Sequence, residues 1–497
     1  MGKKKQVRPK PALSRREPDA LPDEAAGLSP PGPDARHGLC REILTGGLFV
    51  LLALLVYRPC LNGPFLWDDK DWTTDVEWLL RDAGAPLRIW LQPTILQHYF
   101  PVTATSFWLD YQLWGWNPFG FHLHNVLAHG LSCALFWALL RRLRVAGAWF
   151  AAALLAAHPV MVESVAWITE RKNVLSLAFL LGSALSYGRW RGWWRDETAS
   201  GGKSWWAVSA VLFVLALLAK VTVVVFPPAL LAIAWWKTGR LRWRADVLPV
   251  LPHFAAAVLL GLLALWMETH HIGAKGEPFE MPLSHRFLVA GQALWFYLGK
   301  LLWPHPLCVI YYRWELDPGQ GWQWLGLAAA GGAAAALARW GSRGLAAAAL
   351  FYLGALFPVL GFMSVYGMRY AWVADRWVYL PALAVFALAG HVLAALPKRA
   401  LRAAVGAAVL AVCGWLTWQQ AALYSNTDTF WRAAIAGNRN PWEAHNSYSD
   451  ALMTAGRNAE AVEHLRESVR LAPGFAPAHS NLGNALLAAG RVEEALR

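Results

Sequence analysis

Residues 205–236 read WWAVSAVLFVLALLAKVTVVVFPPALLAIAWW, two apolar runs separated by one charged residue, Lys220. A helix needs about 20 mostly apolar residues to cross a bilayer, and each run approaches that length. Comparable runs recur along the chain, at approximately 43–59, 120–140, 146–158, 173–189, 205–219, 222–236, 249–267, 323–339, 345–360, 376–396 and 402–420. The pattern predicts an all-α fold, a polytopic membrane domain of about eleven transmembrane helices.

The composition supports a membrane domain and argues against a nucleic-acid partner. Hydrophobic residues make up 57% of the chain and charged residues only 15%, whereas a soluble domain carries about 25% charge. The 31 tryptophans suit rings at membrane–water interfaces. Much of the net charge of +13 lies in short loops between apolar runs, so membrane topology explains it better than nucleic-acid binding does. The five cysteines show no CxxC spacing and predict neither disulfides nor a metal site.

The charges between the runs alternate in sign. Basic segments are Arg141–Arg144, Arg189–Arg195, Lys237–Arg244, Arg339–Arg343 and Lys398–Arg402, and acidic or mixed segments are Asp68–Asp82, Glu163–Lys172, Glu268–Glu280 and Met368–Arg376. Basic loops favour the cytoplasmic side, which places the acidic segments outside. The alternation holds only if the further apolar stretch 286–303 is a re-entrant or interfacial helix. The C-terminal region then lies on the side opposite the N-terminus.

The ends of the chain differ in character from its middle. Residues 1–42 are basic and rich in proline, without an early apolar segment, which predicts a disordered cytoplasmic tail and no cleaved signal peptide. The membrane domain is expected over 43–422, followed by a linker helix over 423–440 and repeats over 441–497.

The C-terminal region repeats with a period of 34 residues. The matching pairs are Ala444/Ala478, His445/His479, Leu452/Leu486, Gly456/Gly490, Arg457/Arg491 and Ala461/Ala495. This period, with small residues where two helices cross and glycine at the turn, is typical of tetratricopeptide repeats. The second copy stops at Arg497 within its second helix, and such arrays need about three repeats. We therefore expect further repeats in the complete protein.

The first outward loop contains FLWDDKD, residues 65–71. Asp68 and Asp69 follow a membrane span directly, where they can meet a substrate that enters from the interface. One carboxylate could accept a proton from a hydroxyl nucleophile. The alternative is that both are solvated loop acids.

Further ionisable residues stand at the predicted span ends. Glu163 lies in the segment HPVMVESVAWITERKNVL, residues 158–175, and ionisable groups at membrane depth are costly and usually functional. Lys220 could neutralise a lipid phosphate or merely extend toward the interface. Arg376 could clamp a phosphate or pair with Asp375.

Several chemistries have no support in the sequence. GxxxxGK[ST], GxSxG and HExxH motifs are absent, so the sequence indicates neither a P-loop nucleotide hydrolase, nor a serine hydrolase with a nucleophile elbow, nor an HExxH zinc site. An enzyme with its acids outside the membrane has no access to cytosolic nucleotide sugars. Its sugar donor would have to be delivered by the bilayer, as a lipid phosphate.

Four segments together resemble the transmembrane and tetratricopeptide repeat O-mannosyltransferases and their bacterial relatives in the C-type glycosyltransferase superfamily. They are FLWDDKD at 65–71, FHLHNVLAHG at 121–130, HPVMVESVAWITERKNVL at 158–175 and DRWVYLP at 375–381. The resemblance implies transfer of a hexose, mannose, from a polyprenyl-phosphate-linked donor to Ser or Thr hydroxyls of proteins on the periplasmic or lumenal side. The repeats would bind the acceptor.

The resemblance also implies site residues. Asp68 or Asp69 matches an acidic motif that acts as base or lies beside a metal, and Glu163, Arg171 and Arg376 border the same cavity. With Lys220, the two arginines would bind the donor phosphate.

This chain departs from animal members of the resembled family at three positions. It has Lys220-Val221 where they often carry Lys-Glu, Asp375-Arg376 for Glu-Arg, and Asn173 for Asp. These differences leave the sugar and any divalent metal ion open.

Two non-enzymatic functions remain as alternatives: a membrane scaffold with a protein-docking repeat module, and a transporter of lipid-linked sugars. Neither explains the outward acids as well, and a transporter is expected to show internal pseudo-repeats. The acidic motifs resemble the bacterial relatives more closely, and the composition, rich in Ala, Arg, Gly and Trp, suggests a GC-rich genome; together they favour a bacterial inner membrane with the repeats in the periplasm. The endoplasmic reticulum would be the eukaryotic equivalent.

Overall fold

A computed structural model describes residues 33–194, 202–276 and 279–496. Throughout this described part every regular element is a helix, which confirms the all-α prediction. The chain divides into two compact units, 1–44 and 45–497, and the helical bundle and the repeats belong to the second. The first helix, α1 (Pro33–Val56), crosses the boundary between the units. Of the predicted disordered tail 1–42, residues 1–32 lie outside the described residues, and the part from Pro33 onward is helical and belongs to α1.

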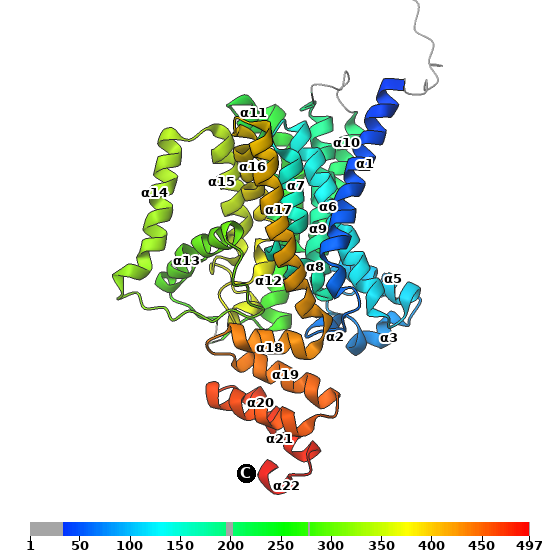
Figure 1. Cartoon of the computed structure of the whole chain (residues 1–497), viewed down its shortest axis with the longest axis vertical. Coiled ribbons are helices and arrows are strands. Elements are labelled where there is room, and N and C mark those ends of the chain that lie inside the picture. Colours follow the sequence, from blue (N-terminus) through cyan, green and yellow to red (C-terminus); the bar gives the residue numbers. More distant parts are fainter. Residues whose placement is uncertain (1–32, 195–201, 277–278, 497) are drawn as a thin grey trace, which may run out of the picture. The chain divides into compact units, whose positions relative to one another are not determined.

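The long helices coincide with the predicted apolar runs (Figure 1). They are α6 (Pro118–Arg142), α7 (Ala148–Ala157), α9 (Arg171–Trp190), α10 (Lys203–Ala219), α11 (Phe226–Thr238), α12 (Leu251–Trp266), α14 (Leu325–Trp340), α15 (Arg343–Leu356), α16 (Ala382–Ala395) and α17 (Arg399–Ala422). Two runs differ clearly from their helices: α1 begins at Pro33, well before the run 43–59, and α16 begins late in the run 376–396. The first residues of the latter run form the 3-10 turn η12 (Asp375–Val378), and the α-helix starts only at Ala382.

By length and composition, four helical stretches of the described chain can each cross a membrane: Pro118–Arg142, Val221–Thr238, Trp243–Ile272 and Arg399–Ser425. A fifth is possible if the bent pair Ala148–Ala157 and Pro159–Ala166 forms one span. Lys203–Ala219, Arg343–Val359 and Ala382–Ala395 are apolar but shorter. The total of about eleven spans stays a prediction. So does the interfacial position of α13 (Leu283–Leu302), which runs obliquely beside α14 in Figure 1.

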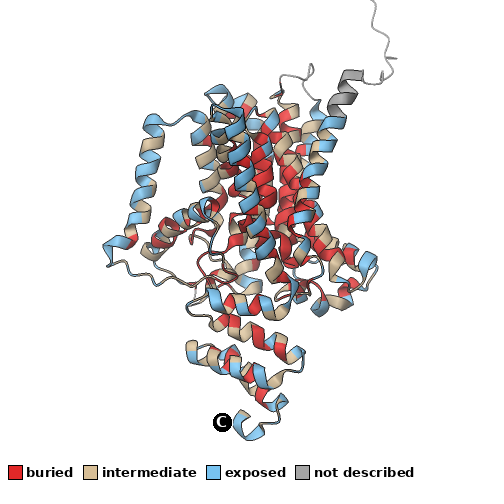
Figure 2. Cartoon of the chain, in the orientation of Figure 1, coloured by how far each residue is buried: buried red, intermediate tan, exposed pale blue. Residues whose placement is uncertain are grey.

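The centre of the bundle is built around α7, whose sequence AWFAAALLAA is small and apolar. Ala151, Ala152 and Leu155 are fully buried, and Figure 2 shows the buried residues gathered in the middle helices. At Gly147 a Cβ atom would lie 1.9 Å from the carbonyl oxygen of Gly390, so only glycine permits this approach of α7 to α16. Close packing of this kind holds the outer loops in fixed positions.

Many large apolar side chains of the bundle point outward. Leu259 and Leu262 on α12 are 70% and 61% exposed, and none of the residues of α14 is buried. An exposed apolar surface of this extent is costly in water and marks a membrane or protein contact. It agrees with a helical bundle surrounded by lipid.

Short helices cover one end of the bundle. They are α2 (Asp69–Trp72), α3 (Glu77–Leu80), α4 (Ala85–Leu91) and α5 (Pro101–Trp114). A small core of their own, which includes Trp72, Leu79 and Phe107, also takes in Phe121 of α6 and Ile168. This second core fixes the first outward loop against the end of the bundle.

The repeats follow α17. α18 (Thr427–Gly437) lies in the predicted linker, and the repeats comprise α19 (Trp442–Thr454), α20 (Asn458–Leu471), α21 (Ala476–Ala488) and α22 (Val492–Ala495). The turns of the two copies contain Gly456 and Gly490, with φ of +74° and +75°, a conformation that favours glycine. Ala444 and Ala478, one period apart, are both fully buried between helices. The helix pairs therefore confirm the repeat architecture predicted from the 34-residue period.

Candidate active site

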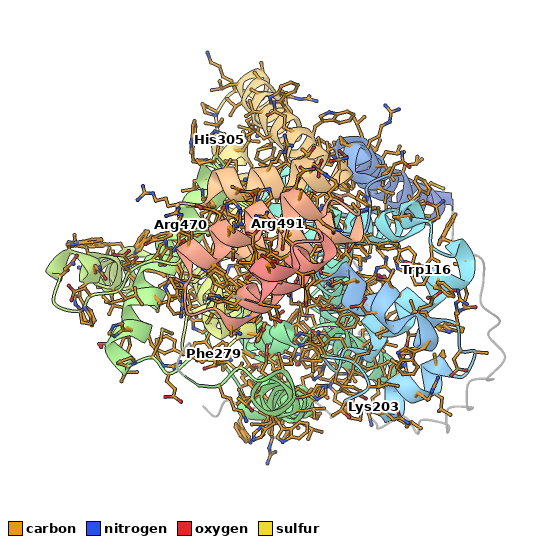
Figure 3. The ribbon with its side chains drawn as sticks, turned by 90° about the horizontal axis from the view of Figure 1, so that it is seen from below. Trp116, Lys203, Phe279, His305, Arg470 and Arg491 are labelled. Carbon is orange, nitrogen blue, oxygen red and sulfur yellow. The ribbon has the colours of Figure 1, made fainter. Side chains whose placement is uncertain are left out.

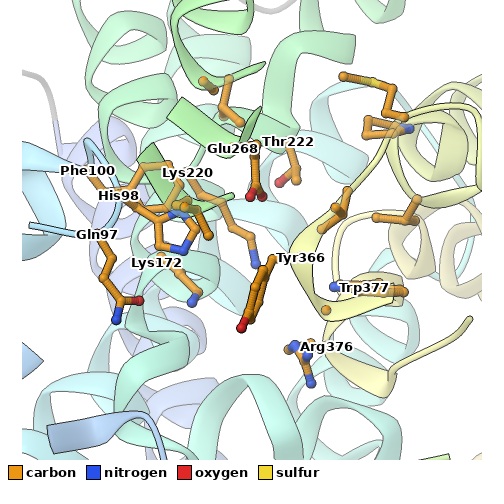
Figure 4. Close-up of a pocket in the computed structure, with 18 of the residues that line it drawn as sticks. Gln97, His98, Phe100, Lys172, Lys220, Thr222, Glu268, Tyr366, Arg376 and Trp377 are labelled. Atoms are coloured by element: carbon orange, nitrogen blue, oxygen red, sulfur yellow. The ribbon is translucent and has the colours of Figure 1, made fainter. Parts of the chain in front are cut away.

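A pocket of about 550 Å³ lies at the end of the bundle that carries the short helices. Its lining residues come from six segments distant in sequence, 67–71, 97–100, 167–172, 220–224, 261–272 and 358–377, and Figure 4 shows several of them. Its polar lining residues are Asp68, Asp71, Gln97, His98, Glu170, Lys172, Lys220, Thr222, Glu268, His271, Ser364, Tyr366, Tyr370 and Arg376. Its apolar lining includes Val221, Val224, Gly261, Ala264, Leu265, Pro358, Val359 and Met363. One wall is therefore charged and another is apolar.

Three cations surround one carboxylate in the charged wall. Lys172 Nζ and Lys220 Nζ each lie 3.1 Å from an oxygen of Glu170, and Arg376 Nε lies 3.7 Å from it. Burial raises the pKa of Glu170, but the charges of Lys172, Lys220 and Arg376 outweigh this and hold it at about 2. Glu170 is therefore ionised at any physiological pH.

Glu163 anchors Arg376 from behind. Its Oε2 accepts a hydrogen bond from the Arg376 backbone N–H at 2.7 Å, and its Oε1 forms an ion pair with the guanidinium. Among these five side chains, Glu163 and Glu170 compensate two of the three cations and one positive charge remains, which Asp68 in the same pocket balances only when it is ionised. Such a cluster can attract an anion such as a phosphate.

Local backbone geometry explains how Lys220 reaches the cluster. α10 ends at Ala219, and Lys220 is extended with φ of −160° and ψ of 127° before the turn η5 (Val221–Val225) begins. This break directs Lys220 into the pocket, where its side chain is mostly buried. A buried ammonium requires compensation, and Glu170 provides it.

The first outward loop is held rigidly by Asp69. Its side chain is 1% exposed; one oxygen accepts the N–H of Leu66 at 2.8 Å and the other accepts the N–H of Thr169 at 2.7 Å. Trp67 stacks on Trp167 with ring centroids 5.1 Å apart. The loop is therefore fastened to the segment that carries Glu163 and Glu170.

Asp68, next in the chain to this anchor, faces the pocket instead. Its carboxylate makes no hydrogen bond or ion pair to any residue in the described part of the chain, and it lines the pocket together with Trp67 and Asp71. Burial and the neighbouring Asp71 charge raise the pKa of Asp68 to about 6, although Lys172 and Arg376 oppose the shift. A carboxylate in this range can accept a proton near neutral pH.

Of the residues singled out in the sequence, Asp68, Lys220 and Arg376 line the pocket, and Asp69 and Glu163 support it from behind. Arg171 lies elsewhere. Its guanidinium is fully buried between α5 and α6, where it pairs with Asp110 and donates to Asn125 Oδ1 and the Phe121 carbonyl, both at 2.8 Å. Successive residues on a helix point about 100° apart, and here Lys172 rather than Arg171 reaches the pocket.

Sequence reasoning missed several lining residues. Glu170 and Lys172 were visible as charges within the 158–175 segment, and the helical phase of α9 distinguishes them from Arg171. His98 and Tyr366 lie in loops without a motif, and only the fold brings them to the pocket. In the described residues no three His, Cys, Asp or Glu side chains gather so that they could hold a metal ion.

A change at Asp69 tests the anchoring of the loop. Asp69→Asn keeps an acceptor for one backbone N–H but turns an amide NH₂ toward the other, which leaves a buried donor unpaired. We expect a loss of about 2 kcal/mol of stability and a fall in any activity that depends on the position of Asp68. Thermal unfolding of the detergent-solubilised protein, followed by tryptophan fluorescence, measures the first effect. An unchanged melting temperature would contradict this role.

Comparison with known proteins gives a family match, similar sequences and a similar solved structure. Residues 452–497 match the tetratricopeptide repeat family. The human protein O-mannosyl-transferase TMTC1 is 27% identical over 531 aligned positions, which cover 91% of this chain and 58% of that protein. The Drosophila melanogaster protein O-mannosyl-transferase Tmtc2 is 36% identical over 180 residues, 33% of this chain and 18% of that protein.

A Caenorhabditis elegans relative, the protein O-mannosyl-transferase F38B6.6, is 28% identical over 152 residues, 28% of this chain and 22% of that protein. The chain thus spans little more than half the length of the human relative. Among solved structures, ArnT from Cupriavidus metallidurans bound to undecaprenyl phosphate aligns with a TM-score of 0.41 and 16% identity, over 88% of this chain and 77% of that one. The chain is a multi-pass membrane protein with tetratricopeptide repeats, similar in sequence to protein O-mannosyl-transferases.

Proposed function

We propose that this chain is a membrane glycosyltransferase, which transfers a hexose, mannose, from a polyprenyl-phosphate-linked donor to Ser or Thr hydroxyls of proteins. The observation that carries the proposal is the juxtaposition of the unpaired Asp68 carboxylate with the cations Lys172, Lys220 and Arg376 in one pocket. The similarity to protein O-mannosyl-transferases over most of the chain supports the same class of reaction.

The two walls of the pocket suit the two parts of such a donor. The phosphate would lie at the three cations, held by charge-assisted hydrogen bonds. The apolar wall formed by η5 and α12, with Val221, Val224 and Leu265, would receive the first units of the prenyl chain. The hexose would then occupy the space between the cations and Asp68.

The reaction is a direct displacement. Asp68 accepts the proton of the acceptor hydroxyl, whose oxygen attacks the anomeric carbon from the face opposite the phosphate. The bond between the anomeric carbon and the phosphate oxygen breaks, and its electrons leave with the lipid phosphate. Lys172, Lys220 and Arg376 stabilise the charge that develops on this leaving group. The configuration at the anomeric carbon inverts.

We place the reaction on the periplasmic side of a bacterial inner membrane, or the lumenal side in a eukaryote, because basic loops mark the opposite ends of the helices. The repeats lie at the same end as the pocket, where α2 and the first repeat meet through the ion pair between Lys70 and Asp450. They would bind the acceptor protein.

The rate of transfer should depend on the ionisation of Asp68. Only the carboxylate can accept a proton, so with a pKa of about 6 the rate should rise with pH and level off above about pH 7. The measurement is single-turnover transfer between pH 5 and pH 8 at saturating donor. A rate that is constant or falls over this range would contradict a base at Asp68.

The proposal is distinguished from the transporter alternative by one experiment in vesicles. The purified protein is reconstituted into vesicles, and both polyprenyl-phosphate-linked radiolabelled mannose and a periplasmic extract are supplied on the side that carries the pocket and the repeats. Label in a protein band supports transfer. Label that crosses the membrane still attached to lipid, with none in protein, supports transport and refutes the enzyme.

A further inference from the structure

A second groove, of about 800 Å³, lies between the first outward loop and the first repeat. Figure 3 looks onto the repeats from their free side and shows Arg470 and Arg491 over the end of the bundle. The groove is lined from the loop by Phe65, Leu66, Trp67, Asp68, Lys70, Asp71, Thr74 and Asp75, and from the repeat side by Asn426, Asp428, Trp431, Asn446, Tyr448, Asp450, Arg457 and Asn481. It is therefore a feature of the junction and not of the repeats alone.

The two cavities meet at Asp68. Trp67, Asp68 and Asp71 line both the groove and the pocket that carries the three cations. A molecule in the groove and a molecule in the pocket can thus approach the same carboxylate from different sides. The arrangement gives the acceptor a route to Asp68 that does not pass through the donor's position.

The groove carries an excess of negative charge. Five aspartates line it, against two cations, Lys70 and Arg457. Lys70 pairs with Asp450 at 2.7 Å, and Arg457 pairs with Asp428 at 2.8 Å. Asp75 is exposed and has no ion pair in the described part of the chain. The excess favours a cationic occupant.

Other lining groups suit a polypeptide backbone. Asn481 Nδ2 donates to Asn446 Oδ1 at 3.1 Å. This leaves the side-chain NH₂ of Asn446 and the side-chain oxygen of Asn481 available to bind a peptide, since neither bonds another group in the described part of the chain. A peptide unit offers one donor and one acceptor, which this amide pair can match. Trp431 and Tyr448 provide an aromatic wall beside it.

We infer that this groove binds an extended segment of the acceptor polypeptide in which Lys or Arg residues flank the Ser or Thr that receives the sugar. The inference rests on the proposed function for the role of Asp68, but the binding itself can be measured without transfer. The chain then selects acceptors by charge at the junction between its membrane domain and its repeats.

The test uses the full-length chain in detergent and two fluorescein-labelled peptides, one with Lys on both sides of a central Ser and one with Glu at the same positions. Fluorescence anisotropy measures their affinities. The variant is Asp75→Lys, in a residue that lines the groove but not the cation pocket. Glu493→Lys, an equal charge change on an exposed residue of α22 outside the groove, is the matched control.

We expect the Lys peptide to bind more tightly than the Glu peptide, and added salt to weaken its binding. Asp75→Lys should weaken the Lys peptide about 5-fold, the effect of one exposed charge pair, and Glu493→Lys should leave it unchanged. Equal affinities for the two peptides, or equal effects of Asp75→Lys and Glu493→Lys, would overturn the inference. Selective binding without sugar transfer would support the groove and refute the proposed function.

Discussion

Asp68→Asn should lower the rate of sugar transfer about 10³-fold, because an amide cannot accept the proton of the hydroxyl nucleophile. Donor binding should remain, since the cations that hold the phosphate, Lys172, Lys220 and Arg376, are untouched. The stability of the fold should also remain, because the Asp68 side chain is not one of the anchors of the loop. The measurement is single-turnover transfer together with equilibrium binding of the lipid-linked donor.

Asp71→Asn is the matched control for this change. Asp71 also lines both cavities, but its carboxylate accepts a hydrogen bond from Gln97 Nε2 at 3.1 Å, which an amide can replace. We expect a fall of less than about 10-fold, from the loss of one nearby charge. A full rate of transfer in Asp68→Asn, or an equal fall of the rate in the two variants, would show that Asp68 is not the base of the reaction.

Lys220→Met should lower kcat/KM about 10²-fold, because one of the three groups that stabilise the departing phosphate is lost. Methionine fills similar space without charge. Lys203→Met is the control on the same helix. Lys203 begins α10 and is exposed, whereas Lys220 follows its last residue and lies in the pocket. Only Lys220→Met should affect transfer.

A second variant separates phosphate binding from a purely structural role of Lys220. If Lys220 serves only to neutralise Glu170, the double change Lys220→Met with Glu170→Gln should recover the lost rate. If Lys220 acts on the phosphate, the double variant should stay as slow as Lys220→Met. We expect the second result, with a weaker affinity for the donor in both variants.

Hydropathy and periodicity predicted the elements of the fold well. Apolar runs coincide with helices because a segment in lipid must satisfy its backbone hydrogen bonds internally. The 34-residue period gave the repeats for a similar reason, since each copy buries the same alanines, Ala444 and Ala478. The start of α16 was harder to predict from the sequence. Residues 376–381 are apolar enough to extend the run, but η12 and Pro381 precede the α-helix.

The candidate site could be predicted in part. The FLWDDKD motif indicated a pair of aspartates, but composition does not distinguish their roles. The structure separates them, because both Asp69 oxygens accept backbone N–H groups whereas Asp68 faces the pocket. Arg171 was expected at the phosphate and is instead buried against Asp110. His98 was not predictable, since its contribution depends on how a loop without a motif packs on α10 and α12.

The proposed reaction transfers a hexose from a lipid phosphate to a hydroxyl. The most direct measurement incubates the purified chain with polyprenyl-phosphate-linked radiolabelled mannose and a Lys-flanked Ser peptide, and separates peptide from lipid. A peptide in which Ala replaces the Ser is the matched control. We expect label on the Ser peptide alone, with inverted anomeric configuration. Donor that stays intact, or that is hydrolysed to free mannose without labelled peptide, would contradict it.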